Sequence, residues 1–203
     1  MWFDKAIKAK YKGEAYIVRY ADDFVCMFQY GHEANAFYKS LIARLAKFGL
    51  EIAEDKSKVI CFGRFARQNS ADGKTETFGF LGFTLINGKT RTDKYRVVHR
   101  TSQKKLSAKQ LAVKEWLWGN MHGSPSDTIL LLNRKLIGHY RYYGISGNSE
   151  GLRKFYKCVV ETFYRVLTRR CQWTYLTWER YHSLLRKHPI ATPKIYVNIW
   201  QTA

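Results

Sequence analysis

The stretch Arg19-Tyr20-Ala21-Asp22-Asp23-Phe24-Val25 places two adjacent carboxylates between two runs of strand-forming residues. Residues 15–20 and 24–28 are both rich in β-branched and aromatic side chains, which favour strands. An Asp pair between two such runs suits a tight turn. The sequence therefore predicts a β-hairpin with Asp22 and Asp23 at its tip, next to apolar strands.

The two adjacent acids are open to two interpretations. On a solvated hairpin they are simply favourable turn residues. If the pair is partly buried, the repulsion and the desolvation of two like charges call for a cation. In a very basic protein that cation would be Mg²⁺ serving phosphoryl transfer. These few residues alone leave both interpretations open.

The chain is strongly basic, and the excess of positive charge is uneven. Its 203 residues include 35 Lys+Arg and 16 Asp+Glu, which gives a formal net charge of +19. Residues 100–203 hold 18 of the basic and 5 of the acidic residues. Such a charge opposes compaction unless a polyanion relieves it, so nucleic acid is the favoured partner. An anionic membrane is the competing explanation, but we expect no membrane partner because no apolar segment is long enough to span a bilayer.

The cysteines, at positions 26, 61, 158 and 171, show no Cys-x-x-Cys pair and no repeated spacing. This pattern predicts neither a disulfide scaffold nor a zinc site, and all four are expected to be small buried residues. The first residues lack the apolar core of a signal peptide, so we expect an intracellular, cytoplasmic protein.

Hydrophobic periodicity divides the chain near residue 90 into a mixed α/β part and an all-helical part. Before this point the sequence predicts the end of a helix over 2–12, stopped by Gly13, and a helix over 32–48, stopped by Gly49. It also predicts short strands over 50–52 and 59–62, a loop over 68–76, a strand pair or one bent strand within 78–86, and a hairpin turn at Asn87-Gly88. The elements predicted after it are four helices that start near Ser102, Ser124, Ser149 and Thr177.

Each helix of the second part carries one apolar stripe, which indicates ordinary core packing. The other faces carry basic side chains, with aromatic residues such as Trp173, Tyr175 and Trp178 nearby. Any single cation could simply be solvated, but together they predict an RNA surface where cations bind phosphates and rings stack on unpaired bases. The predicted RNA-binding residues are Lys104, Lys105, Lys109, Arg134, Lys135, Arg141, Tyr142, Arg153, Lys154, Lys157, Arg165, Arg169 and Arg170.

Four motifs, in order along the chain, resemble the C-terminal portion of a group II intron reverse transcriptase/maturase. Tyr20-Ala21-Asp22-Asp23 resembles the metal-binding hairpin of this family, and residues 49–58 resemble the motif that follows it. Phe80-Leu81-Gly82-Phe83 resembles the motif that grips the primer. Residues 132–144, continued by residues 169–179, resemble the maturase-specific region, also called domain X or the thumb.

The resemblance implies an α+β fold, with the C-terminal part of a polymerase palm over 1–90 and an all-helical thumb or domain X over 91–203. The partial palm would be an antiparallel hairpin sheet with packed helices. The intact protein would be an RNA-directed DNA polymerase that uses two Mg²⁺ ions, and its RNA binding would assist intron splicing and mobility. Its partners would be group II intron RNA, an RNA template with a DNA primer, and dNTP.

The resemblance also implies roles for individual residues. Asp22 and Asp23 would be the catalytic Mg²⁺ ligands, and Lys56 with Ser57 would lie near the incoming nucleotide. The remaining residues of the nucleotide and primer region would be Tyr20, Ala21, Phe80, Leu81 and Gly82.

Polymerases of this kind also need a carboxylate from an earlier strand, and fingers that cover the nucleotide. Both would have to precede residue 1, so a possible further partner is an N-terminal reverse transcriptase portion. We therefore expect the isolated chain to be incomplete for catalysis. Two alternatives stay open: a non-catalytic RNA-binding maturase fragment, and an inactive truncated product that lacks the fingers and the first catalytic Asp.

Overall fold

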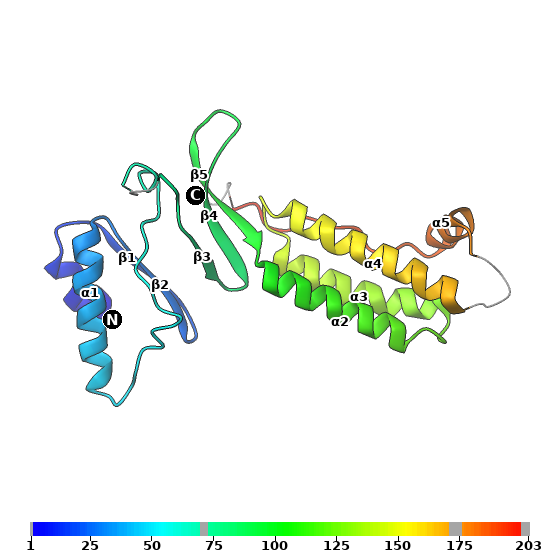
Figure 1. Ribbon diagram of the computed structural model, residues 1–203, viewed down its shortest axis with the longest axis horizontal. Helices are drawn as coiled ribbons and strands as arrows, with labels where there is room; N and C mark the ends of the chain where they lie inside the picture. The colour runs from blue at the N-terminus through cyan, green and yellow to red at the C-terminus, as the bar shows by residue number, and fades with distance from the viewer. Residues whose placement is uncertain (1, 70–72, 171–175, 200–203) are drawn as a thin grey trace. The chain divides into compact units, whose positions relative to one another are not determined.

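The computed structural model describes residues 2–69, 73–170 and 176–199, and its fold is α+β with small antiparallel sheets, as predicted (Figure 1). These residues form two compact units. The first unit comprises Met1–Leu81 and Ile86–Val97, and the second comprises Gly82–Leu85 and Val98–Ala203. The assignment of a palm to residues 1–90 and a thumb to residues 91–203 stays a prediction.

The predicted hairpin is present in the first unit. Strands β1 (Ala15–Tyr20) and β2 (Asp23–Phe28) pair antiparallel, in a register that runs from Ala15 opposite Phe28 to Tyr20 opposite Asp23. Because side chains alternate across a strand, one face carries Ala15, Ile17 and Phe28. This face joins the small core of the unit.

Helix α1 (Gly31–Ala46) covers this face of the hairpin, and the helix predicted over 32–48 is confirmed. Gly49 follows α1 with a φ of 67°, a left-handed conformation that terminates helices. The helix predicted over 2–12 is a π-helical turn, Phe3–Ile7, followed by a 3₁₀ turn, Lys8–Lys10. The buried apolar residues of this unit's core are Phe3, Ile7, Ala15 and Phe37.

Gly13 lies in close contact with the start of α1. Buried Glu33, in the first turn of α1, accepts backbone N–H bonds from Lys12 (2.9 Å) and Gly13 (3.2 Å). A Cβ at position 13 would lie 2.7 Å from the Tyr30 ring and 2.9 Å from Glu33 Oε2. A side chain at position 13 would therefore force the Tyr30 ring and the Glu33 carboxylate to shift.

A second sheet has the strand order β3-β4-β5, with bounds Thr77–Phe80, Phe83–Lys89 and Tyr95–Thr101. Of the two alternatives predicted within 78–86, a strand pair or one bent strand, the structure has the strand pair. Leu81 and Gly82 connect β3 to β4 with φ values of 50° and 78°, as in the type I′ turns that suit hairpins. The predicted loop is confirmed for residues 68–69 and 73–76, and residues 70–72 lie outside the described residues.

Two strand predictions and one turn prediction are wrong. Residues 50–52 and 59–62 form no strand; Leu50 N–H instead bonds Leu45 O at the end of α1 (3.1 Å). Asn87-Gly88 lies inside β4, and the chain turns over residues 90–94, where Thr90 N–H bonds Lys94 O (2.8 Å). Asn87 is held in the strand because its Oδ1 accepts bonds from Gly63 N–H (3.0 Å) and the Tyr95 hydroxyl (2.9 Å).

The prediction of buried cysteines holds only in part. Cys26 and Cys158 are half-buried, and burial raises the pKa of the Cys26 thiol to about 12. Cys61 is exposed, which corrects the prediction for that residue. Cys171 lies outside the described residues.

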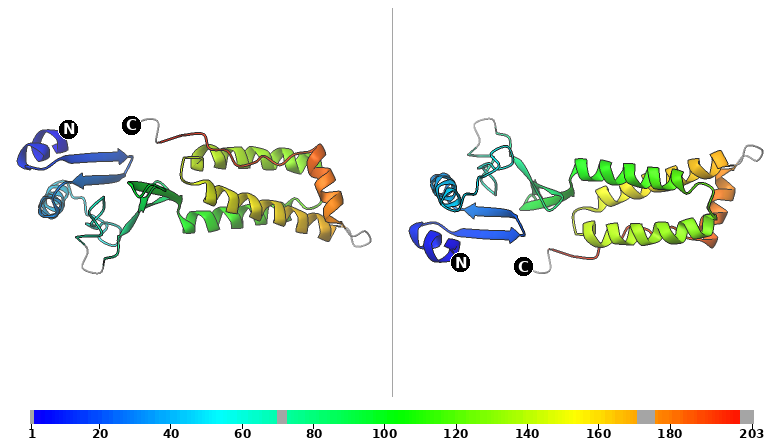
Figure 2. Two further views of the ribbon diagram at one scale, coloured as in Figure 1. Left: turned by 90° about the horizontal axis from the view of Figure 1, so that it is seen from above. Right: turned by 90° about the horizontal axis from the view of Figure 1, so that it is seen from below.

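The second unit contains the four predicted helices: α2 (Gln103–Gly119), α3 (Pro125–Tyr143), α4 (Ser149–Arg170) and α5 (Trp178–Lys187). Figures 1 and 2 show α2, α3 and α4 side by side, with the chain after α5 running back along α3. The predicted stripes meet in one core. Its buried members are Leu106, Val113, Leu117, Ile129, Leu132, Leu136, Tyr140, Tyr143, Leu152, Phe155, Val159, Phe163, Val166, Tyr181 and Ile190.

Two side-chain amides tie this bundle together. Asn148 is buried; its Oδ1 accepts from Thr101 N–H, and its Nδ2 donates to Thr101 Oγ1 and Tyr143 O, each over 2.8 Å. Asn133 on α3 donates to Pro189 O (2.9 Å) and accepts from Ala191 N–H (2.7 Å). The first amide joins the end of β5 to the start of α4, and the second fixes the segment after α5 to α3.

Candidate catalytic hairpin and nucleic-acid interface

The structure places Asp22 and Asp23 together at the tip of the β1–β2 hairpin. Ala21 and Asp22 form the two-residue connection, and Asp23 opens β2 opposite Tyr20. Arg19 Nε donates to Ala21 O (2.8 Å) and closes the turn. Ala21 has a φ of 52°, a left-handed conformation that costs an alanine about 1–2 kcal/mol. Backbone strain of this kind often marks functional positions.

Both carboxylates are exposed to solvent, as are the flanking Tyr20 and Phe24. The partly buried pair that would demand a cation is therefore not observed. Within the described residues, no three His, Cys, Asp or Glu side chains form a group that could hold a metal ion. The carboxylates of Asp22 and Asp23 are oxygen ligands of the type that Mg²⁺ prefers. They would need further ligands to complete a Mg²⁺ site.

Lys56 and Ser57 lie in the same unit as the hairpin, in a short turn. The backbone N–H groups of both residues donate to Ala53 O over 3.0 Å. Lys56 is exposed and Ser57 is half-buried. Within the described ranges Lys56 forms no ion pair with either hairpin acid, so the proximity implied by the resemblance stays a prediction.

The Phe80-Leu81-Gly82-Phe83 motif forms the turn between β3 and β4. A Cβ on Gly82 would lie 3.0 Å from the Tyr143 hydroxyl of α3, and Gly82 O accepts from Ser102 N–H (2.9 Å). Phe83 stacks on Tyr142 with an interplanar angle of 11° and meets Tyr143 edge-on. The glycine is therefore required by the positive φ and by the close approach to α3.

The twelve basic residues of the predicted RNA surface are all exposed, and Tyr142 is 55% exposed. They lie on α2, α3 and α4 and not on one stripe of a single helix. Only two of them form ion pairs among the residues described: Lys154 with Glu150 (2.8 Å) and Lys157 with Glu161 (3.8 Å). Most of the positive charge on the helices is thus available to an external anion.

Helices α2 and α4 are neighbours, because Gln110 Nε2 on α2 donates to Lys154 O on α4 (3.5 Å). The cations of α2 and α4 therefore lie on adjacent helices of the bundle. Other members of the set make local contacts: Lys135 lies over the Trp116 ring (5.1 Å), and Arg170 Nη1 donates to Gly123 O (2.7 Å). Of the aromatic residues expected nearby, Trp178 is exposed, while Trp173 and Tyr175 lie outside the described residues.

The sequence did not indicate that Trp118 and Tyr164 lie together at the surface of the helical unit. Together with Arg165, Thr168 and Arg169 they line a cleft of about 420 Å³ on the helical unit. One signal was present: Arg165 and Arg169 are like charges four residues apart on a helix, an arrangement that is unfavourable without an anion. Trp118 gave no periodic signal because it lies outside the apolar stripe of α2.

His139 is the most perturbed histidine of the helical unit, but its surroundings are structural. Burial lowers the pKa of its imidazole to about 4, with a smaller contribution from the positive charge of Lys109. Its ring stacks on Phe155 with the centroids 4.0 Å apart. A neutral imidazole packed in this way serves the core, and we assign it no chemistry.

In the parts of the chain that the structure describes, no helix combines the length and the apolar character needed to cross a membrane.

Residues 2–85 match the family model described as reverse transcriptase (RNA-dependent DNA polymerase). The match contains the hairpin acids, Lys56 and the Phe80-Leu81-Gly82-Phe83 turn, and it ends before the four helices of the second unit. No significant match was found among curated proteins or among solved structures. The first part of the chain is therefore similar to reverse transcriptases, which are RNA-directed DNA polymerases and bind a nucleic-acid template and primer.

Proposed function

We propose that this chain is the C-terminal part of a group II intron reverse transcriptase/maturase, and that its helical unit binds intron RNA. The observation that carries this proposal is the array of exposed cations on α2, α3 and α4, few of which are paired with acids. Phosphates are their natural counterions, and binding would release the ions condensed on the RNA. The match over residues 2–85 supports the reverse transcriptase part of this proposal.

In the intact enzyme, Asp22 and Asp23 would hold Mg²⁺ at the hairpin tip. Both residues supply carboxylate oxygens, which Mg²⁺ prefers, and they are adjacent in the chain. A third carboxylate would have to come from another strand. When bound, the metal ions would activate the primer 3′-hydroxyl and stabilise the leaving pyrophosphate. Lys56 would contribute positive charge near the triphosphate, and the Phe80–Gly82 turn would help to position the primer.

An N-terminal reverse transcriptase portion is the partner that would complete this site. The hairpin face that α1 does not cover carries Tyr16, Val18, Tyr20 and Met27, whose side chains are 45–66% exposed. Exposed apolar patches of this kind often mark interaction surfaces. We propose that the N-terminal portion packs against this face. We also propose that the assembled protein is cytoplasmic.

A non-catalytic maturase fragment is the second candidate. The observation that favours it is that the described residues offer no third metal ligand near the hairpin, whereas the helical unit has a continuous core of its own. In that case the RNA performs the splicing chemistry, and the protein helps it to reach the active shape by binding.

The RNA-binding proposal is tested with the full chain and a structured intron RNA. The triple variant Arg134→Gln/Arg141→Gln/Arg153→Gln should weaken binding roughly tenfold or more, because three phosphate contacts are lost. The matched control, Lys39→Gln/Lys47→Gln/Lys58→Gln, removes the same charge from exposed positions of the first unit and should change affinity less than threefold. Equal losses in both variants would contradict a specific surface on the helices.

The catalytic proposal is tested by primer extension with Mg²⁺. The chain alone should give no product, and addition of an N-terminal reverse transcriptase fragment should restore synthesis. Asp22→Asn/Asp23→Asn should abolish the restored synthesis and leave RNA binding unchanged. Synthesis that survives this double variant would remove the hairpin acids from the proposed site.

A further inference from the structure

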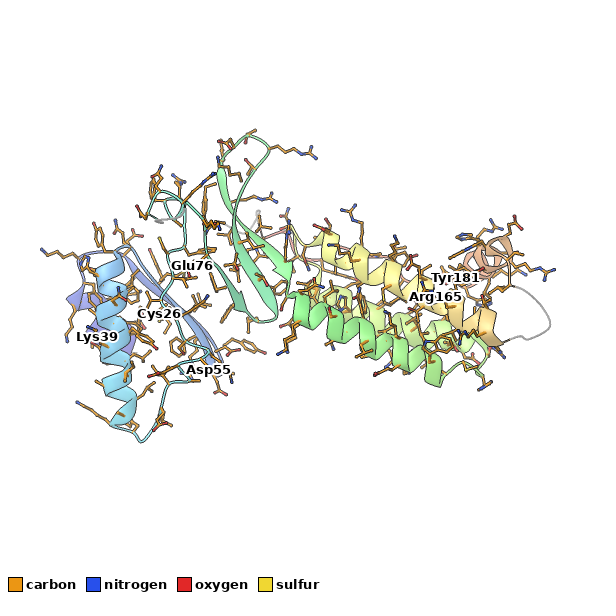
Figure 3. All side chains as sticks on the ribbon, viewed as in Figure 1. Cys26, Lys39, Asp55, Glu76, Arg165 and Tyr181 are labelled. Atoms are coloured by element: carbon orange, nitrogen blue, oxygen red, sulfur yellow. The ribbon has the colours of Figure 1, made fainter. Side chains whose placement is uncertain are left out.

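A cleft of about 420 Å³ lies where the C-terminal half of α2 meets the C-terminal half of α4. Trp118 comes from α2, and Tyr164, Arg165, Thr168 and Arg169 come from α4. Figure 3 labels Arg165 on the half of α4 that leads towards α5. The volume lies in the range of about 300–1,000 Å³ that is common for small-ligand sites.

The lining combines a flat apolar ring with two cations. Trp118 is 37% exposed, although a large aromatic side chain normally gains from burial. The Arg169 guanidinium carbon lies 5.9 Å from the centre of that ring. No acidic side chain lines the cleft, and among the described residues neither Arg165 nor Arg169 forms an ion pair.

The aromatic wall of the cleft is fixed by its neighbours. The Tyr164 ring stacks on Trp178 of α5, with centroids 3.8 Å apart and planes at 12°. Its hydroxyl donates to Leu176 O (2.9 Å), and the Thr168 hydroxyl donates to Tyr164 O (2.9 Å). A wall held in this way does not have to be ordered when a ligand binds, which lowers the entropic cost of binding.

We propose that this cleft binds one unpaired RNA nucleotide, with the base stacked on Trp118 and the adjacent phosphates paired with Arg165 and Arg169. The inference rests on the proposed RNA-binding function and locates a contact within it. It accounts for two unfavourable features at once: two like charges four residues apart and an exposed indole. An RNA phosphate neutralises the first, and a base covers the second.

An unpaired nucleotide fits this lining better than a duplex does. In A-form RNA the interior bases are stacked on one another on both faces, so a protein ring cannot reach those faces. Stacking on an aromatic side chain is available to every base and tolerates sequence changes. The cleft should therefore distinguish single-stranded from paired RNA, without a strong preference among bases.

The test measures the affinity of the full chain for a fluorescent eight-nucleotide single-stranded RNA and for a blunt duplex of the same length. Trp118→Ala should weaken binding to the single strand about tenfold and change duplex binding less than twofold. Trp118→Phe keeps a ring and should retain most of the affinity. Circular dichroism of each variant confirms that the helices are intact.

The charge half of the site is tested with Arg165→Ala/Arg169→Ala. This variant should reduce the salt dependence for the single strand by about 1.4 in the slope of log affinity against log salt, since each phosphate contact contributes about 0.7. The matched control is Arg180→Ala/Arg186→Ala, which removes two exposed arginines from α5. That control should leave the slope nearly unchanged.

The possible results separate the cleft from the broader function. If wild-type protein binds RNA but Trp118→Ala binds both RNAs as wild type does, the stacking site is wrong and the RNA-binding function stands. If wild-type protein binds neither RNA, the proposed function itself fails. If an acidic peptide such as oligo-glutamate binds in a Trp118-dependent manner and RNA does not, the cleft serves a protein partner and the inference is overturned.

Discussion

The two units of this chain differ in how completely they bury their apolar side chains. The helical unit has one core that draws on all four helices and on Ile190 beyond them. Among the described residues of the first unit, the core cluster buries Phe3, Ile7, Ala15 and Phe37, and the outer face of the hairpin stays exposed. The helical unit, which has the larger core, also carries the surplus of cations. Under the proposed function, RNA binding would need only that unit, whereas polymerisation would need the first unit, whose core is smaller.

The largest expected effect is the loss of a core ring from the helical unit. Phe155→Ala should lower the free energy of unfolding by about 3–5 kcal/mol, because the ring is buried and stacked on His139. Urea titration followed by circular dichroism at helical wavelengths measures this change. The control is Phe24→Ala on the hairpin, where the ring is 42% exposed and a loss below about 1 kcal/mol is expected. Similar losses at both positions would break the contrast between the units.

The next effect is a pH dependence that belongs to the helical unit. Burial lowers the pKa of His139 to about 4, from an ordinary value near 6.5. As the pH falls from 6.5 to 4, the unfolded chain takes up this proton before the folded chain does, so stability is lost in that window and is fully present above it. The loss should be on the order of 3 kcal/mol.

The same titration with His139→Leu should remove most of this loss, and His182→Ala, at an exposed histidine, should leave it in place. A pH profile for His139→Leu that matches the wild-type profile would show that another group controls stability in acid.

The hairpin turns of the two sheets predict smaller effects of opposite sign. Gly82→Ala should destabilise the protein by about 1–3 kcal/mol, because position 82 has a φ of 78° and a new Cβ would lie 3.0 Å from the Tyr143 hydroxyl. The midpoint of urea unfolding measures the change. An unaltered midpoint would mean that this turn relaxes without cost.

Ala21→Gly is the smallest change and should stabilise by about 0.5 kcal/mol, since glycine adopts a φ of 52° without strain. A differential unfolding measurement against wild type is sensitive enough to detect it. A destabilised variant would argue against strain at the tip of the acidic hairpin.

The sequence predicted the elements whose signals are local. The helix stripes, such as Leu132 with Leu136, and the alternating strands around Asp22-Asp23 depend on neighbouring residues only, and both are confirmed. The strands predicted at 50–52 and 59–62 failed because a strand needs a pairing partner, which no local pattern supplies. Asn87-Gly88 failed because a tertiary contact decided it: Gly63 and Tyr95 hold the Asn87 side chain within β4.

The candidate sites divide in the same way. The hairpin acids could be found from the sequence because they are adjacent along the chain. The Trp118 cleft could not, because it depends on the contact between α2 and α4 and on the bracing of Tyr164 by Trp178. The sequence could identify individual cations as exposed helix residues. It could not show that Arg165 and Arg169 lie beside Trp118, because that depends on tertiary packing.

The most direct test of the RNA-binding assignment is the salt dependence of the full chain's affinity for a structured intron RNA. If the exposed cations of α2, α3 and α4 make six to ten phosphate contacts, affinity should fall by about 10³–10⁵ between 50 and 200 mM salt. Asp22→Asn/Asp23→Asn should follow the same line as wild type, because the hairpin takes no part in this binding. Affinity that is independent of salt, or no binding at 50 mM, would contradict the assignment.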